Sequence, residues 1–397
     1  MVQDPAAETN GNDPETKGNA TETNGNGPET KGNKNGEKAA VRKKSKQFSV
    51  MTLCYILGIL AGVVVLLLFC LKTGETLRYA NFYAKAKKEF SIAGLNDGLT
   101  VQGIDKVSSS WISRLENASG TFLTVNGDRY LESGYMKDES TSRIYRVNTG
   151  RKLSENNKDY LLLCDENGAE SRTHAGGLTS SDEMEKVWVC GAGTSVLVYD
   201  LNTVATAGAG SKITALSSFE VPMGSAYCFF DGTYLWVGEF YREQNYPTDP
   251  SHHLQAAGGV LHHSLILGYR PDPEDPGNVK TAPEVALSIP DLVQGMAVDG
   301  EGRFYLSSSY AVASSHLSIY KNVLSEEAKD TILIGEEEIP LYFLDESTIM
   351  KKETLPPMSE DLCLNGDRVC IMNESATQKY LFGRLLHGKY VFSYKTE

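Results

Sequence analysis

The stretch Val293-Gln-Gly-Met-Ala-Val-Asp-Gly-Glu-Gly-Arg-Phe-Tyr-Leu-Ser307 decides the fold of this chain. Met296 and Val298 alternate with small or polar residues, and the alternation resumes after residues 299–302. Asp299, Gly300 and Gly302 are residue types that favour a tight turn. The pattern therefore predicts two antiparallel strands joined by a turn, followed by a third strand at residues 316–320.

Four further stretches repeat this unit of inner strand, turn, second strand and third strand. The five inner strands are expected to begin near residues 120, 175, 225, 295 and 360. Fourth strands are expected at residues 159–164, 217–221, 285–289 and 341–344. Short alternating runs separated by Gly, Asn, Asp and Pro are typical of an all-β sandwich, barrel or propeller.

The two ends of this β-rich region complement each other. The fifth unit reaches Glu397 without an outer strand, whereas residues 99–107 form a strand that belongs to no unit. Pairing the two would close a ring and leave no terminal edge exposed. We therefore predict an all-β, five-bladed β-propeller over residues 98–397, with six blades as the alternative.

Residues 293–307 also resemble an NHL-repeat blade, whose pattern is Gly, small-apolar-Val-Asp, a Gly turn and an aromatic β-run. The wider group includes the gluconolactonase-like propellers, so the resemblance implies a propeller fold. Enzymes of that kind hold a divalent cation on Glu, Asn and Asp side chains around the central axis. Here the corresponding loops carry His174, Met223, Gln294 and Glu360-Asp361. The ligand set has no residue-by-residue match, so no cofactor is expected, and a divalent cation stays an open alternative.

A membrane segment precedes the propeller. Residues 48–71 are uncharged and rich in Leu, Val and Ile, and as a helix they would span about 36 Å, enough for a hydrocarbon core of roughly 30 Å. Basic residues are denser before the segment (Lys34, Lys38, Arg42, Lys43, Lys44, Lys46) than after it (Lys72, Arg78, Lys85). The positive-inside rule then predicts a single-pass signal anchor with a cytoplasmic N-terminus and an extracytoplasmic C-terminal domain.

Two segments flank this anchor. Residues 8–19 return nearly unchanged as residues 22–33, and residues 1–47 have almost nothing apolar to bury, which predicts a disordered cytoplasmic tail. Residues 72–97 are expected to form a juxtamembrane stalk containing a short helix, because residues 75–91 lack Gly and Pro.

The net charge of −13 and the pI near 5.1 argue against a nucleic-acid partner. The sequence contains no nucleophile elbow, P-loop, HExxH or dinucleotide-binding glycine signature. Cys363 and Cys370 flank a turn at Gly366-Asp367 and should lie opposite each other, either as a disulfide or as two buried thiols.

Loops that enter the inner strands, and loops that join second to third strands, share one face of a propeller. The first set would place Arg172, His174, Gln294, Glu360 and Asp361 near the mouth of the central channel. A carboxylate pair with a histidine could transfer protons or hold a cation. Solvated loop residues without a catalytic role are the alternative.

A long loop over residues 241–261 should overhang the same face. It begins with Tyr241-Arg242, which are candidate ligand contacts. Four histidines accompany it: His252, His253, His262 and His263. Neutral imidazoles suit zinc or copper, but the spacing matches no zinc pattern, and adjacent residues on a strand point to opposite faces.

The sequence favours a membrane-anchored propeller that binds a small molecule, a glycan or a protein on this face, with the lipid bilayer as a second partner. The alternative is a tethered hydrolase or lyase that acts on a sugar, lactone or ester. In that case His174, Glu360 and Asp361 would be the catalytic candidates. Binding is favoured over catalysis because the sequence offers no complete catalytic set.

Overall fold

The structure is a computed structural model that describes residues 50–92, 95, 98–115, 119–272, 274, 279–280, 282–377, 379–380 and 386–395. The expected repeat tail, residues 1–47, lies outside the described residues. The chain divides within its first helix into two units, Met1–Gly58 and Ile59–Glu397, and the strands all belong to the second.

The first helix, α1 (Val50–Arg78), contains residues 50–71 of the predicted membrane segment, and residues 48–49 lie outside the described residues. Its apolar part has no buried side chain, and the helix is long and apolar enough to cross a membrane by length and composition. It continues past residue 71, where the membrane segment was expected to end, and α2 (Ala80–Lys85) follows after a break at Tyr79. The chain then becomes a strand, β1 (Ala86–Ser91).

Five antiparallel sheets of four principal strands each form the predicted five-bladed propeller. Blade 1 contains β2 (Leu99–Val107), β3 (Arg129–Met136), β4 (Arg143–Asn148) and β5 (Tyr160–Cys164). Blade 2 contains β6 (Gly177–Ser181), β7 (Lys186–Ala192), β8 (Ser195–Asp200) and β10 (Ser217–Glu220). Blade 3 contains β11 (Tyr227–Phe230), β12 (Leu235–Gly238), β15 (Ser264–Tyr269) and β16 (Val285–Ile289). Blade 4 contains β17 (Val293–Val298), β18 (Phe304–Ser308), β19 (Ser315–Tyr320) and β22 (Ile349–Leu355). Blade 5 contains β23 (Ser359–Asn365), β24 (Arg368–Asn373), β25 (Tyr390–Lys395) and β1.

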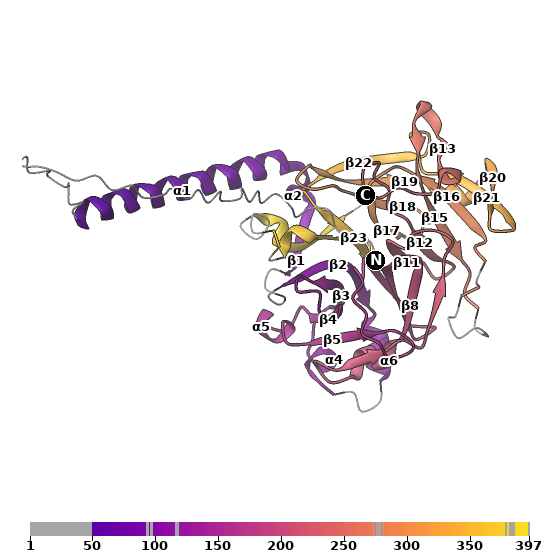
Figure 1. The fold of residues 1–397 in the computed structure, drawn as a ribbon, viewed down its shortest axis with the longest axis horizontal. Helices are drawn as coiled ribbons and strands as arrows, with labels where there is room; N and C mark the ends of the chain where they lie inside the picture. The colour runs from indigo at the N-terminus through magenta and orange to yellow at the C-terminus, as the bar shows by residue number, and fades with distance from the viewer. Residues whose placement is uncertain are drawn as a thin grey trace, which may run out of the picture. The chain divides into compact units, whose positions relative to one another are not determined.

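The inner strands contact one another in the cyclic order β2, β6, β11, β17 and β23, and β23 returns to β2. Four of them, β2, β11, β17 and β23, are labelled close together in Figure 1. The spaces between neighbouring blades are filled by four apolar clusters of buried side chains. Residues 293–307 form the β17–β18 hairpin of blade 4, with Met296 paired to Leu306.

Smaller elements decorate this ring. One short strand and one hairpin extend it: β9 (Lys212–Thr214) runs parallel to β5, and β20 (Asp330–Ile334) with β21 (Glu337–Phe343) joins blade 3 beside β16. A second hairpin consists of β13 (Leu254–Gln255) and β14 (Leu261–His262). The short helices are α3 (Ser109–Arg114), α4 (Thr121–Thr124), α5 (Leu153–Asn156), α6 (Leu201–Thr206), η1 (Pro250–His252), η2 (Ala257–Gly259), η3 (Val323–Ser325), η4 (Glu374–Ala376) and η5 (His387–Lys389).

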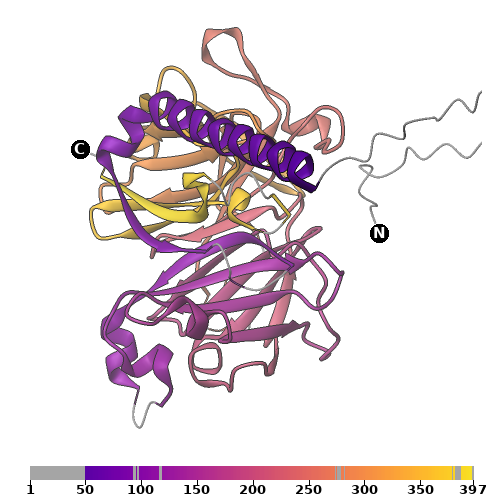
Figure 2. The same ribbon diagram turned by 90° about the vertical axis from the view of Figure 1, so that its left-hand side faces the viewer.

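The ring closes differently from the prediction. Residues 99–107 are the inner strand of blade 1, because both faces of β2 are buried, which suits the centre of the ring and not its edge. The closing strand is β1, which pairs with β25 over Ala86↔Tyr394 to Ser91↔Tyr390. Figure 2 shows this N-terminal strand beside the yellow C-terminal strands. Exposed Lys87 and Lys88 on β1 fit an edge strand, so the expected stalk is partly a strand of the propeller.

Two other strand predictions were wrong. Residues 120–131 do not begin blade 1, because Thr121–Thr124 forms one helical turn that buries the adjacent residues Phe122 and Leu123 together; a strand would point them to opposite faces. Residues 341–344 belong partly to β21 in blade 3, whereas the outer strand of blade 4 is the polar β22.

Cys363 and Cys370 lie opposite each other on neighbouring strands, as the turn at Gly366-Asp367 predicts. The two residues are direct partners in the β23–β24 hairpin, both are buried, and both are free thiols in the structure.

Candidate functional site at the channel mouth

Loops leading into the inner strands and loops joining second to third strands lie on one face, because neighbouring strands within each blade are antiparallel. On that face, blades 5, 1 and 2 bring together a group of polar and aromatic side chains that we call the mouth cluster. Its members are Gln102, Tyr135, His174, Glu360, Glu374, Lys379 and Tyr380.

An aromatic pair forms the outer part of the mouth cluster. The rings of Tyr135 and His174 are stacked, with centroids 4.7 Å apart and an interplanar angle of 17°. Lys379 donates a hydrogen bond of 2.8 Å from Nζ to the Tyr135 hydroxyl. Tyr135 ends β3, His174 lies in the loop before β6, and Lys379 follows η4, so three separate segments build this surface.

Two acids form the inner part. The carboxyl group of Glu374 accepts hydrogen bonds from Gln102 and Tyr380, and burial raises its pKa to about 7 although Lys379 acts in the opposite direction. Glu360 begins the inner strand β23 and is buried. Burial raises the pKa of Glu360 well above its usual range, and the neighbouring acids Glu374 and Asp361 raise it further. A protonated or proton-sharing pair of carboxyl groups can donate as well as accept hydrogen bonds.

Asp361 lies inside the ring and not at its mouth. It is fully buried, and Oδ2 accepts hydrogen bonds from the backbone N–H groups of Ile104 (3.2 Å) and Leu178 (3.4 Å) on β2 and β6. Its backbone packs so closely on β17 that a Cβ atom at Gly295 would lie 2.4 Å from Asp361 Cα. The residue expected to contact a ligand therefore connects three blades beneath the mouth cluster.

The remaining predicted mouth residues are less engaged. Arg172 is exposed and forms a long ion pair of 3.9 Å with Glu170. Gln294 is half-buried at the irregularity between Val293 and Gly295 where β17 pairs with β18. Of the residues predicted from the loops, the structure thus brings His174 and Glu360 into the mouth cluster.

The loop between β12 and β15 carries a second group on the same face, which we call the histidine cluster. Tyr241 stacks on His263 with ring centroids 4.3 Å apart, and the rings of His253 and His263 lie 4.7 Å apart. His263 Nδ1 lies 3.0 Å from both carboxylate oxygens of Asp291, and His253 Nε2 lies 3.2 Å from Thr248 Oγ1.

The other two histidines, His252 at the end of η1 and His262 at the end of β14, contact different partners. His252 Nδ1 lies 2.8 Å from Glu239 Oε1, and His262 Nδ1 lies 3.1 Å from Ser288 Oγ; both histidines are buried. Within the part of the chain that the structure describes, no three His, Cys, Asp or Glu side chains are arranged to hold a metal ion. Arg242 instead packs over the Tyr310 ring at 3.8 Å.

Tyr135, Glu374, Lys379 and Tyr380 were not predicted from the sequence as site residues. Tyr135 lies near the end of β3 in blade 1, Glu374 begins η4 directly after β24 in blade 5, and Lys379 lies further along the same connection. His174 and Glu360 were predicted because they lie in loops that enter inner strands. Applying the same rule to the loops between second and third strands would have included Glu374 and Lys379.

Comparisons with known proteins give likenesses of fold. No protein-family model matches the chain, and no curated protein matches it. The PQQ-bound aldose sugar dehydrogenase from Streptomyces coelicolor aligns over 78% of this chain and 96% of its own, with 13% identity and a TM-score of 0.40. A structural genomics protein of unknown function from Bacteroides thetaiotaomicron aligns over 79% and 76%, with 13% identity and a TM-score of 0.32. The Cps50 (Swd1) β-propeller domain from Myceliophteria thermophila aligns over 68% and 67%, with 7% identity and a TM-score of 0.30.

These scores are too low to carry an argument about function. The chain is a five-bladed β-propeller on the strength of its own strand pairing, and the resemblance of residues 293–307 to a propeller blade is confirmed at the level of the fold.

Proposed function

We propose that this chain is a membrane-anchored propeller that binds a small polar ligand at the channel mouth. The observation that carries the proposal is the stacked pair of Tyr135 and His174 beside Lys379, above the acids Glu374 and Glu360. Flat aromatic surface with a few converging polar groups is the usual composition of a small-molecule site on a rigid frame.

The mixed chemistry of the mouth cluster favours a saccharide or another polyol. An aromatic face can pack against the C–H groups of a sugar ring, while the ammonium group of Lys379 donates and the carboxyl groups of Glu374 and Glu360 accept hydrogen bonds from hydroxyl groups. A large apolar ligand is disfavoured because the inner wall of this site consists of acids.

Binding can be measured by thermal unfolding of the full chain in detergent across a panel of neutral and charged saccharides. A ligand at about 100 times its Kd should stabilise the protein by about 2.7 kcal/mol. His174→Ala and Tyr135→Ala should each weaken binding at least tenfold. His253→Ala, in the histidine cluster of the same face, is the matched control and should bind normally. Equal loss in the control, or unchanged binding in both site variants, would refute the proposal.

A tethered hydrolase is the second candidate, and one observation favours it. The pKa of Glu374 is raised to about 7, which suits a general acid or base near neutral pH. Chromogenic esters, lactones and glycosides are the substrates to assay. Glu374→Gln should abolish hydrolysis while retaining saccharide binding. Hydrolysis that survives this substitution, or a wild-type protein without hydrolytic activity, would refute the hydrolase candidate and leave ligand binding as the proposed function.

We further propose that α1 anchors the protein with its N-terminus in the cytoplasm and the propeller outside. The support is the apolar surface of α1 and the basic residues concentrated before it. Protease added to right-side-out cells or vesicles should digest or release the propeller and spare an N-terminal tag. Protection of the propeller under these conditions would reverse the proposed orientation.

A further inference from the structure

A cavity of about 310 Å³ opens on the face of the ring opposite the mouth cluster, at the base of blades 1 and 2. It lies between the loop that contains α4, the turn that contains α5, and the segment that follows α6. All three are connections of first to second strands or of third to fourth strands. A ligand held here would therefore lie on the other side of the propeller from the channel mouth.

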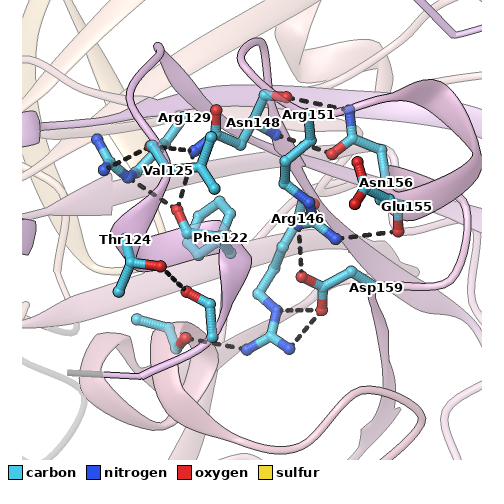
Figure 3. Close-up of polar contacts among 12 residues, drawn as sticks. Phe122, Thr124, Val125, Arg129, Arg146, Asn148, Arg151, Glu155, Asn156 and Asp159 are labelled. Carbon is cyan, nitrogen blue, oxygen red and sulfur yellow. Dashed lines mark hydrogen bonds and ion pairs between the residues drawn. The ribbon is translucent and has the colours of Figure 1, made fainter.

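Two guanidinium groups share one carboxylate in the wall of this cavity (Figure 3). Arg146 Nε donates to Asp159 Oδ1 at 2.8 Å, and Arg151 Nη1 donates to Asp159 Oδ2 at 2.7 Å. The side chains of Arg146, Arg151 and Asp159 are only 6%, 4% and 9% exposed. The trio therefore carries one buried positive charge that it does not balance internally.

A third buried arginine increases the imbalance. Arg129 donates only to uncharged acceptors, including the carbonyl oxygens of Phe122 (2.8 Å) and Leu123 (2.7 Å), and Figure 3 shows its guanidinium group beside the helical turn α4. Burial lowers the pKa of Arg129, as expected for a cation held away from water. Uncompensated buried charge is destabilising, and an anion in the cavity, whose lining includes Arg146 and Arg151 but not Arg129, would offset part of it.

The two cavity arginines, Arg146 and Arg151, differ in their hydrogen-bond partners. Arg146 Nη1 donates to the carbonyl oxygens of Val204 (3.1 Å) and Ala205 (3.0 Å), so this residue joins blade 1 to the end of α6. Arg151 Nη2 donates to the Glu155 carbonyl oxygen at 3.0 Å, but its buried Nε has no hydrogen-bond partner among the described residues. A buried donor without an acceptor is destabilising, and an oxyanion could supply that acceptor.

We propose that this cavity binds a small molecule carrying a carboxylate or phosphate group, with Arg151 as the direct contact. Planar guanidinium groups match the geometry of both oxyanions. Lys158 and the acid Glu155 also line the cavity, so the charged side chains of its lining keep one net positive charge, and the Phe122 ring offers apolar surface to the body of the ligand. The volume is at the lower end of the range for ligand pockets, which limits the ligand to about the size of one sugar or amino acid.

Oxyanion binding can be tested with the full chain in detergent at constant ionic strength. The probes are inorganic phosphate, glucose 6-phosphate and glucuronate, with glucose as the uncharged control; the first two separate the phosphate group from the sugar, and glucuronate tests a carboxylate. In the His174→Ala background, which weakens saccharide binding at the channel mouth, we expect a saturable rise in melting temperature and binding heat with glucose 6-phosphate or glucuronate, and no comparable rise with glucose. Absence of saturable binding by all three anions would overturn the proposal.

Two variants then assign the binding to the cavity. Ala209 lines the cavity and is exposed, so Ala209→Phe should fill the space without removing a hydrogen bond and should abolish anion binding. Ala313→Phe, at an exposed position on the opposite face, is the control and should bind as the wild type does. Arg151→Lys keeps the charge but not the fork and should weaken binding at least tenfold. Unchanged anion binding in Ala209→Phe would place the anion elsewhere and refute the proposal.

Discussion

Asp361 shows how a single acid contributes to this ring. Its Oδ2 accepts hydrogen bonds from N–H groups of two other blades, while Oδ1 has no partner among the described residues. Burial raises the pKa of Asp361 well above its usual range, despite the N–H groups that favour its charged form. The side chain therefore acts as a hydrogen-bond acceptor that joins blades 5, 1 and 2.

Removing this side chain should destabilise the ring without disturbing the mouth cluster directly. We expect Asp361→Ala to lower the free energy of unfolding by about 2–4 kcal/mol, because the N–H groups of Ile104 and Leu178 lose their acceptor. Asp361→Asn, which resembles the neutral acid, should cost much less. Urea denaturation of the three proteins measures both values, and equal stability of wild type and Asp361→Ala would contradict this role.

At the same scale, the sequence could suggest single site residues but not their companions. His174 and Glu360 were found because each occupies a loop that leads into an inner strand. Tyr135, Glu374 and Lys379 are contributed by other connections, and their proximity depends on how blades 1 and 5 meet across the closure of the ring. Asp361 was assigned to the mouth because it directly follows Glu360 in the sequence, but its carboxyl group instead accepts hydrogen bonds from the backbone of β2 and β6.

At the scale of elements, the closing strand β1 is held from both sides. It pairs with β25, and α2 just before it inserts Phe82 between Phe392 (ring centroids 5.5 Å apart) and Tyr394 (6.0 Å). A chain that begins at residue 98 lacks these contacts and exposes the edge of β25. We expect residues 98–397 to aggregate, because unpaired edge strands recruit other chains, and residues 72–397 to stay monomeric, as size-exclusion chromatography would show.

A point substitution tests the same closure within the intact chain. Phe82→Ala should lower the free energy of unfolding by about 3–5 kcal/mol, the usual cost of emptying a buried aromatic position. Leu77→Ala, at a largely exposed position of α1, should change it by less than about 0.5 kcal/mol. If both substitutions had the same small effect, α2 would not be part of the ring closure.

Strands were predicted correctly where apolar and polar residues alternate strongly, and were missed where the local sequence does not identify the pairing partner. The β17–β18 hairpin and the outer strands β5, β10 and β16 follow clear apolar patterns and lie close to the expected positions. The closing strand β1 reads Ala-Lys-Lys-Glu-Phe-Ser, a composition equally suited to a helix, and its partner lies at the other end of the chain. Such long-range pairing leaves no local mark in the sequence.

At the scale of the whole molecule, buried acids outnumber buried bases. Burial raises the pKa of five acids: Asp105 to about 6, Glu374 to about 7, and Glu132, Glu360 and Asp361 well above their usual range. The folded protein binds more protons than the unfolded chain between about pH 4, where acids of the unfolded chain ionise, and these raised values. Stability should therefore fall as pH rises through this window.

We expect the melting temperature of the propeller to be higher at pH 5.5 than at pH 8. His262 and His316, whose pKa burial lowers, act in the opposite direction below about pH 6.5, but they are fewer. Differential scanning calorimetry at constant ionic strength measures the profile. A melting temperature that increases towards pH 8 would show that the acids do not dominate.

Glu132 offers a matched variant for this profile. It is fully buried, pairs across the sheet with Ile104 and Tyr145, and neither carboxyl oxygen has a hydrogen-bond partner among the described residues. Glu132→Gln removes the ionisation but keeps the shape. This variant should exceed the wild type in melting temperature at pH 8 and approach it near pH 5; an offset independent of pH would contradict the assignment.

The pairing of β1 with β25 also has a consequence for the order of biosynthesis. β1 ends at Ser91 and its partner begins at Tyr390, so roughly 300 residues must be synthesised after the first strand before the ring can close. At about 5–20 residues per second this takes about 15–60 s. During that interval β1 has no partner, so blade 5 stays incomplete and the ring can close only when synthesis of the described chain is nearly finished.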